Sequence, residues 1–125
     1  YVDFRGYIAN FYDLTEILAT KSIGLAPYKP IIGSFSYYSD PSKIKLYMCC
    51  GLPVITTAMT TMSDLISKTG SGLIIDYSEK ALANAVTYLL SNKKRYLLYK
   101  KAATKLSQEF DVNNILQSAI NKIPY

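Results

Sequence analysis

The sequence predicts an α/β fold of the Rossmann-like type, with a parallel sheet as the middle of three layers and additional helices at the C-terminus. Three short apolar runs lack polar alternation, and a segment with helical periodicity follows each of them. Strands of this kind are buried on both faces, as in parallel sheets that helices cover on both sides. The 125 residues fit a single domain, 1–125. Since the chain starts with strand-like residues and no initiator Met, we expect a fragment of a longer protein.

The first quarter of the chain predicts a strand, a helix and a second strand. Val2 to Ile8 is typical of a strand or the end of one, and Asn10 to Lys21 predicts a helix. Asp13 and Glu16 have the spacing of a capping box, so the helix is expected to start at Asp13. Residues 22–28 then form the first of the three buried apolar runs.

A loop and a short helix separate the first buried run from the second. Residues 29–39 are rich in Pro, Gly, Ser and Tyr, and loops this long inside a compact domain are usually functional or mobile. A helix is expected from Ser42 to Cys50, where Gly51 ends it in the left-handed conformation. Its apolar face is formed by Ile44, Tyr47 and Met48. Residues 52–57 then form the second buried strand.

The third strand lies between two further predicted helices. Residues 62–68 predict a helix that ends at Gly70, and residues 72–76 predict the strand. Asp76 and Glu79 again have capping-box spacing and open a helix that runs to about residue 91. Its apolar stripe consists of Leu82, Ala85, Val86 and Leu89.

Two more helices are predicted at the C-terminus, over residues 93–109 and 112–123, with Asp111 as a cap between them. The first begins with KKRYLLYKK, which holds five of the fourteen cations of a chain with net charge +5. The solvated face of a helix is the favoured interpretation, and attraction to anionic lipid or nucleic acid is the alternative. Because no aromatic stacking motif accompanies the charge, we expect no nucleic-acid partner.

The segment SDPSKIKLYMCCGLPVITT, residues 39–57, carries the strongest functional signal. Asp40 has the side chain of a good helix N-cap, and Pro41 suits the first helical position. Ser42 and Lys43 add a hydroxyl group and a cation at the same helix end. Free amides and the helix dipole favour a phosphate there. The residues therefore predict an anion site, with a structural cap and a solvated lysine as the alternative.

Polar and aromatic residues follow the predicted strands. Tyr28 comes at the end of the first strand, Thr56 and Thr57 end the second, and Asp40 joins them if its loop folds back. Ligands of open parallel α/β sheets bind beyond the carboxyl ends of the strands. We therefore expect these residues to face one crevice.

The cysteine usage argues against common metal sites. Cys49 and Cys50 are the two cysteines, and the sequence has no histidine and no Asp-x-Asp motif. A structural zinc ion needs more ligands of these kinds, so no metal site is expected. The two thiols are interpreted as small buried apolar side chains, in keeping with a reducing compartment. No run of about 18 apolar residues predicts a transmembrane helix.

Five pieces of the chain, in the same order, carry a family resemblance. They are GYI followed by DLTEILATK, then SIGLAPY, then DPSKIKLYMCCGLPVITT, then GSGLIID with SEKALANAVTYLL, and finally RYLLYKKAATKLSQEFDVNNI. Together they resemble the C-terminal nucleotide-binding half of a GT-B glycosyltransferase of the group 1 type. The third piece is the most specific of the five.

The resemblance implies an enzyme that transfers a sugar from a nucleotide-sugar donor to a hydroxyl acceptor, in polysaccharide or glycoconjugate biosynthesis. Carried over by position, Ser42 and Lys43 meet the donor diphosphate, and Tyr28 lies near the base or the sugar, where a rim aromatic is an equal alternative. The catalytic residues stay unidentified. The nucleotide-sugar is a substrate, so no cofactor is expected.

The resemblance also implies partners and a location. The acceptor would be a glycan or a lipid-linked glycan, held by an N-terminal acceptor domain that lies outside this sequence. We therefore expect residues 1–125 alone to be inactive. A cytoplasmic location is expected, and a peripheral position at the inner face of the membrane is compatible with it.

Two positions depart from the family pattern. The Glu that often binds the nucleotide ribose falls at Leu46, and the other Glu of that pair falls at Tyr38. A leucine cannot accept from ribose hydroxyls, so Asp40 and Tyr47 are the nearby candidates. This departure favours the main alternative, a non-catalytic α/β interaction or regulatory module with a degenerate nucleotide site. A nucleotide-sugar epimerase is a weaker alternative.

Overall fold

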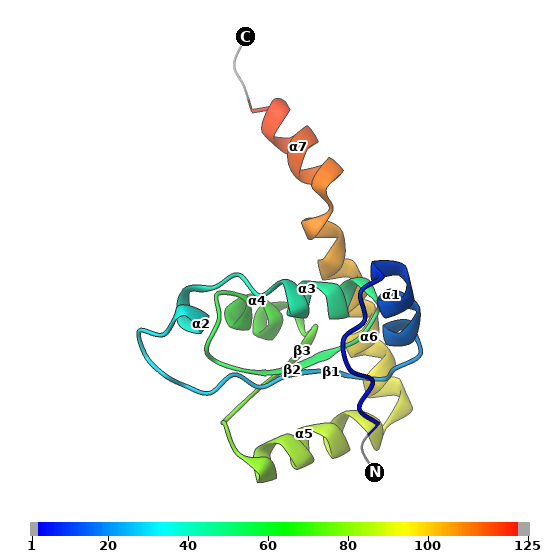
Figure 1. The fold of residues 1–125 in the computed structure, drawn as a ribbon, viewed down its shortest axis with the longest axis vertical. Coiled ribbons are helices and arrows are strands. Elements are labelled where there is room, and N and C mark those ends of the chain that lie inside the picture. Colours follow the sequence, from blue (N-terminus) through cyan, green and yellow to red (C-terminus); the bar gives the residue numbers. More distant parts are fainter. Residues whose placement is uncertain (1–2, 123–125) are drawn as a thin grey trace.

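A computed structural model describes residues 3–122, without the side chains of residues 35 and 36, and contains helices around a small sheet (Figure 1). The elements in chain order are α1 Phe11–Ala19, β1 Gly24–Ala26, α2 Phe35–Tyr38, α3 Ser42–Cys49, β2 Val54–Thr57, α4 Met62–Thr69, β3 Gly72–Ile75, α5 Glu79–Leu90, α6 Lys93–Ser107, the 3-10 turn η1 Gln108–Phe110, and α7 Val112–Ile120. From residue 10 onward the predicted order of strands and helices is confirmed, and the three buried strands are one or two residues shorter than expected at one or both ends.

The sheet is parallel, in the order β1-β2-β3. Gly24, Val54 and Gly72 stand in one row at the amino ends of the strands, and Ala26, Thr56 and Ile74 form a row near the carboxyl ends. Because all strands point the same way, the segments that leave them emerge along one edge of the sheet. Loop residues 27–41 and the start of α3 belong to that edge.

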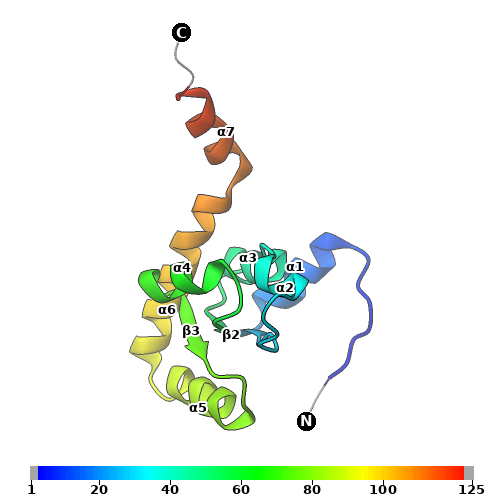
Figure 2. The ribbon, with the colours of Figure 1, turned by 90° about the vertical axis from the view of Figure 1, so that its left-hand side faces the viewer.

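Helices cover both faces of the sheet, which confirms the predicted three-layer α/β fold (Figure 2). The helices α3, α4 and α6 pack on one face, in a core that includes Ile44, Met48, Val54, Ile66, Ala103 and Leu106. The other face is covered by α5, through Ala85 and Leu89 against Ile55. The predicted stripe of α5 is therefore its core face, with Leu82 and Val86 at the margin. Tyr99 of α6 also packs against this second core.

Two glycines allow close contacts at the amino ends of the strands, Gly72 within the sheet and Gly24 between the sheet and α3. A Cβ atom on Gly72 would collide with the carbonyl oxygen of Val54, and one on Gly24 would collide with the ring of Tyr47. Such contacts leave no room for a side chain. Gly51 has φ +74°, the left-handed conformation predicted for the residue that ends α3.

Two predicted helix starts are wrong, because another residue caps the helix. Asn10 accepts from the Tyr12 N–H at 2.8 Å, so α1 starts before Asp13. The first turn of α5 is capped by Ser78, whose hydroxyl accepts from the Ala81 N–H at 3.1 Å, rather than by Asp76. The Asp111 cap is confirmed by bonds from the Asn113 and Asn114 amides at 2.8 and 3.2 Å.

Other expectations also need correction. Residues 3–8 form no strand, and Val2 lies outside the described residues. Cys49 is exposed and Cys50 is half-buried at the end of α3, so the prediction of two buried thiols is wrong, since Ile44 and Met48 form the buried face of this helix. The loop 29–39 contains the short helix α2. The last predicted helix ends at Ile120, and Ile123 lies outside the described residues.

The C-terminal helix α7 projects away from the α/β body (Figures 1 and 2). None of its residues is buried, and Val112, Ile115, Leu116 and Ile120 expose apolar side chains. Within residues 3–122, no helix combines the length and the apolar character that crossing a membrane would require.

Candidate functional site

The N-terminus of α3 lies at the carboxyl edge of the sheet. Pro41, and not Asp40, occupies the cap position, and no side chain caps the helix. The Pro41 carbonyl accepts from the N–H groups of Ile44 and Lys45, at 3.1 and 3.4 Å. Among the described residues, the N–H groups of Ser42 and Lys43 have no partner. Uncapped amides at the positive end of a helix dipole attract an anion.

The outer face of α3 borders a groove. Ser42, Lys43, Leu46 and Tyr47 line one wall, and Phe11, Leu14 and Leu18 of α1 line the other. The cavity has a volume of about 600 Å³. Its walls are largely apolar, while Ser42 and Lys43 place a hydroxyl and an ammonium group at the end where the helix begins. A molecule with a flat or apolar part and an anionic part would match this distribution of groups.

Tyr47 lines the groove, and Tyr28, which is not a lining residue, lies near enough to affect the pKa of Tyr47. The ring of Tyr47 rests on Gly24, and both tyrosines pack against the core of α3, α4 and α6. Burial raises the pKa of both phenols, and the proximity of Tyr28 raises the pKa of Tyr47 further. Both hydroxyl groups therefore stay protonated at neutral pH and can donate hydrogen bonds.

Threonine side chains fix the ends of β1 and β2 to each other. The Thr57 hydroxyl donates to the Tyr28 carbonyl at 2.7 Å and accepts from the Tyr28 N–H at 3.1 Å. The Thr56 hydroxyl donates to the Ala26 carbonyl at 2.7 Å. These bonds continue the sheet beyond its backbone ladder and set the position of Tyr28. Tyr28 and Thr57 thus meet at this edge, but the expectation that Thr56 and Thr57 face a crevice is wrong, because both threonines are buried and their hydroxyls bond to the backbone that leaves β1.

Asp40 does not share this environment. Its carboxylate pairs with the Lys45 ammonium, which also lies 5.0 Å from the centre of the Phe110 ring. Lys45 leaves α3 on a different side from Lys43 and Tyr47, because it lies two residues from each of them, which is a rotation of about 200° around the helix. The structure thus groups Ser42, Lys43 and Tyr47, sets Tyr28 beside Tyr47, and turns Asp40 away.

The wall formed by α1 was not predicted as part of a site. Phe11, Leu14 and Leu18 repeat at three- and four-residue spacing, which in the sequence indicates a core face. None of the α1 residues is buried, and that exposure depends on the neighbouring elements rather than on the local pattern. A second hollow of about 300 Å³ lies across the sheet, between Pro27 and the start of α5, and also escaped prediction.

The described residues contain no cluster of three or more His, Cys, Asp or Glu side chains that could hold a metal ion. The polar groups that face the groove are nitrogen donors and hydroxyls, a set that suits an anion rather than a cation. The candidate anion site therefore consists of the start of α3 with Tyr28 and Tyr47.

The family of this chain follows from its match to a known protein family. The family described as Glycosyl transferases group 1 matches residues 1–92, which is most of the chain. The chain belongs to this family. The match spans the whole sheet, α3 and both walls of the groove, and ends at Asn92, the residue that caps α6. Comparisons with curated proteins and with solved structures find no match.

Membership in the group 1 glycosyl transferases indicates a role in glycosyl transfer, and such a reaction requires a sugar donor and an acceptor. The C-terminal piece of the sequence resemblance, from residue 95 onward, lies beyond the matched region. The binding roles of Ser42, Lys43, Tyr28, Tyr47 and Asp40 stay predictions.

Proposed function

We propose that this chain is the donor-binding, C-terminal half of a GT-B glycosyltransferase and holds a nucleotide-sugar with its diphosphate at the start of α3. The observation that carries the proposal is the set of groups gathered there: two N–H groups without a partner among the described residues, the Ser42 hydroxyl and the Lys43 ammonium, beside a groove of about 600 Å³. Anions bind readily at such helix ends.

The same groups suit the chemistry of sugar transfer. The oxygen of the acceptor hydroxyl forms a bond to the anomeric carbon and releases its proton to solvent, and the bond from that carbon to the diphosphate breaks. The electron pair leaves with the nucleoside diphosphate, so its negative charge increases as the reaction proceeds. Backbone N–H groups and a lysine placed at that point stabilise the transition state more than the ground state. The donor is a substrate in this scheme, and no cofactor is proposed.

The tyrosines would contact the nucleoside or the sugar. Tyr47 lines the groove, Tyr28 lies beside it, and both phenols are protonated donors at neutral pH. Leu46 occupies the same wall and offers no acceptor for a ribose. We therefore propose that tyrosine hydroxyls and ring stacking replace the ribose-binding carboxylate, with Asp40 engaged by Lys45 instead.

Nucleotide titration tests the donor site. Because a ligand that binds the folded state raises the melting temperature, UDP, GDP and their sugars are compared by thermal unfolding. We expect one nucleoside diphosphate to raise the melting temperature and Lys43→Gln to reduce that shift. Lys45→Gln is the matched control, since it removes the same charge from another face of α3. No shift with any nucleotide, also in the longer protein, would contradict the proposal.

We further propose that the chain acts as part of a longer cytoplasmic enzyme of polysaccharide or glycoconjugate assembly. An additional domain would hold the glycan or lipid-linked glycan acceptor, so residues 1–125 alone should show no sugar transfer. The free thiols of Cys49 and Cys50 fit a reducing compartment. An assay with radiolabelled donor and the isolated chain tests this part, and measurable transfer would refute it.

A non-catalytic interaction module is the second candidate. One observation favours it: Leu46 faces the groove together with Phe11, Leu14 and Leu18, so most of the lining is apolar. A degenerate nucleotide site would lose its carboxylate in this manner. The two candidates differ in the titration above, because the module predicts no response to any nucleotide.

A further inference from the structure

Helix α6 uses one side to hold the fold together. Ala103 and Leu106 are buried in the core. The guanidinium of Arg95 turns back to α5, where it lies 3.8 Å from the centre of the Tyr88 ring and donates to the Tyr88 carbonyl at 2.6 Å. Tyr96 donates to the Ser22 carbonyl at 3.0 Å. The polar members of this side therefore have partners inside the molecule.

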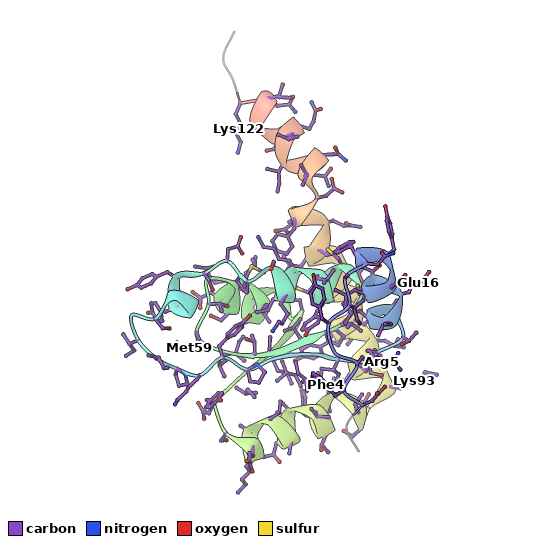
Figure 3. All side chains as sticks on the ribbon, in the orientation of Figure 1. Phe4, Arg5, Glu16, Met59, Lys93 and Lys122 are labelled. Atoms are coloured by element: carbon purple, nitrogen blue, oxygen red, sulfur yellow. The ribbon has the colours of Figure 1, made fainter. Side chains whose placement is uncertain are left out.

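The opposite side of α6 has a different composition. We call it the α6 outer face, and it consists of Lys93, Lys94, Leu97, Leu98, Lys101 and Lys105. Helical spacing places these residues on neighbouring turns of one surface. Leu97 is 50% exposed and Leu98 is 61% exposed, so two large apolar side chains stand in solvent between lysines. Lys93 lies at the corner where the chain leaves α5 (Figure 3).

The charge of this face is uncompensated. No acidic residue occurs from residue 93 to residue 107. Among the described residues, none of the four lysines forms an ion pair. The nearest acid in sequence is Glu109, which lines a hollow together with Lys105 at the far end of the helix. The field over the first three turns of α6 is thus positive.

We propose that the α6 outer face docks the protein on an anionic membrane surface, with the helix lying flat. The side chains of Leu97 and Leu98 would enter the boundary between headgroups and acyl chains, while the lysines reach lipid phosphates at the same level. Exposed apolar residues flanked by lysines on one helix face are the pattern of interfacial helices. The family match ends before α6, so it assigns no role to this face.

A lipid surface fits this face better than a nucleic acid does. Both ligands would attract the lysines, but phosphates and riboses gain nothing from two exposed leucines at the middle of the contact. Proteins that bind single strands present aromatic rings for base stacking. The aromatic residues of α6, Tyr96 and Tyr99, pack on the inner side.

Vesicle binding tests the proposal with the full chain. Sedimentation is compared for vesicles of phosphatidylcholine alone and of phosphatidylcholine mixed with phosphatidylglycerol. We expect binding to the mixed vesicles only, weakened by added salt. Substitution of Lys93, Lys94 and Lys101 by Gln should weaken binding on the order of fivefold for each lysine, about a hundredfold together. Leu97→Asn and Leu98→Asn should each weaken it about tenfold without changing the charge.

A charge-matched control separates this face from the overall charge. Gln at Lys29, Lys80 and Lys122 lowers the net charge from +5 to +2, as the first triple variant does, but at three scattered positions. Membrane docking through α6 requires that this control keep most of its affinity. Equal loss in both triple variants, or leucine variants that bind like the wild type, would overturn the proposal. Binding of a single-stranded oligonucleotide that depends on the lysines but not on the leucines would assign the face to nucleic acid instead.

Discussion

The two ends of the parallel sheet are held together in different ways. At the amino ends, Gly72 lies against the backbone of β2 and Gly24 against the Tyr47 ring of α3, and neither position has room for a side chain. At the carboxyl ends, threonine hydroxyls bond to the carbonyls of the neighbouring strand, and the segments that follow carry exposed polar groups. Close packing therefore holds the amino ends of the strands together, and side-chain hydrogen bonds hold the carboxyl ends together.

This difference separates stability from function in the molecule. Packing tolerates no added atoms, so the amino ends should respond strongly to small substitutions. The carboxyl ends keep the N-terminus of α3 and Tyr28 accessible, so changes there should alter ligand binding more than folding. Such a division follows from parallel topology, which sends all connecting loops with potential ligands to one edge.

The largest loss of stability is expected for Gly72→Ala, at about 3 kcal/mol, because the added methyl group meets the backbone carbonyl of Val54. Gly24→Ala should also destabilise, but its collision partner is the Tyr47 side chain. Urea denaturation of both variants, each with and without Tyr47→Ala, measures the difference. Tyr47→Ala should relieve part of the cost at Gly24 and none at Gly72. Equal relief at both positions would show that the amino end is not held by backbone contact.

Thr57→Val should cost about 1–2 kcal/mol, because it removes both hydrogen bonds that the hydroxyl makes with the Tyr28 backbone. Thr57→Ser is the matched control, since it keeps the hydroxyl and should stay near the wild type. Thermal or urea unfolding measures the cost. If serine and valine destabilise alike, packing of the threonine methyl group rather than hydrogen bonding holds this end.

Lys43→Gln should change the free energy of unfolding by less than about 0.5 kcal/mol, because the side chain is exposed. The same variant should lose most of the nucleotide-dependent rise in melting temperature. The pair of measurements is the sharpest test of the division between the two ends. A large loss of stability without ligand would place Lys43 in the fold rather than in the site.

The smallest effect is expected at alkaline pH. Burial raises the pKa of Tyr28 and Tyr47 above the value of an unfolded chain, about 10. The folded protein therefore loses these protons at higher pH than the unfolded chain. Their contribution is complete below about pH 10 and is lost as the pH rises through the folded-state pKa. Tyr47→Phe should make the alkaline fall in stability shallower, measured by urea titrations across this range, whereas the exposed Tyr12→Phe should not.

Much of the fold was predictable from the sequence, because it depends on local patterns. The apolar runs predicted the three strands, and the apolar stripe of α5 predicted the face of this helix that packs in the core. The left-handed Gly51 and the Asp111 cap were also predictable, since glycine and aspartate satisfy these positions through their own backbone or side chain. The meeting of Tyr28 with Thr57 followed from the parallel topology.

Competition between neighbouring residues was not predictable in the same way. Asn10 caps α1 instead of Asp13, and Ser78 caps α5 instead of Asp76. All four side chains have an oxygen that can accept from a helix amide, so local sequence does not decide between them. Asp40 is the most instructive case. Its carboxylate suits a helix cap, but Lys45 competes for it, and the position of Lys45 depends on contacts distant in sequence.

Lys45 joins the loop before α3 to the base of the projecting helix α7. Its ammonium group pairs with Asp40 and lies over Phe110, the last residue before the α7 cap. A ligand or a substitution that displaces either partner also alters the support of the other. The loop before α3 and the turn that leads into α7 thus share contacts with a single lysine side chain.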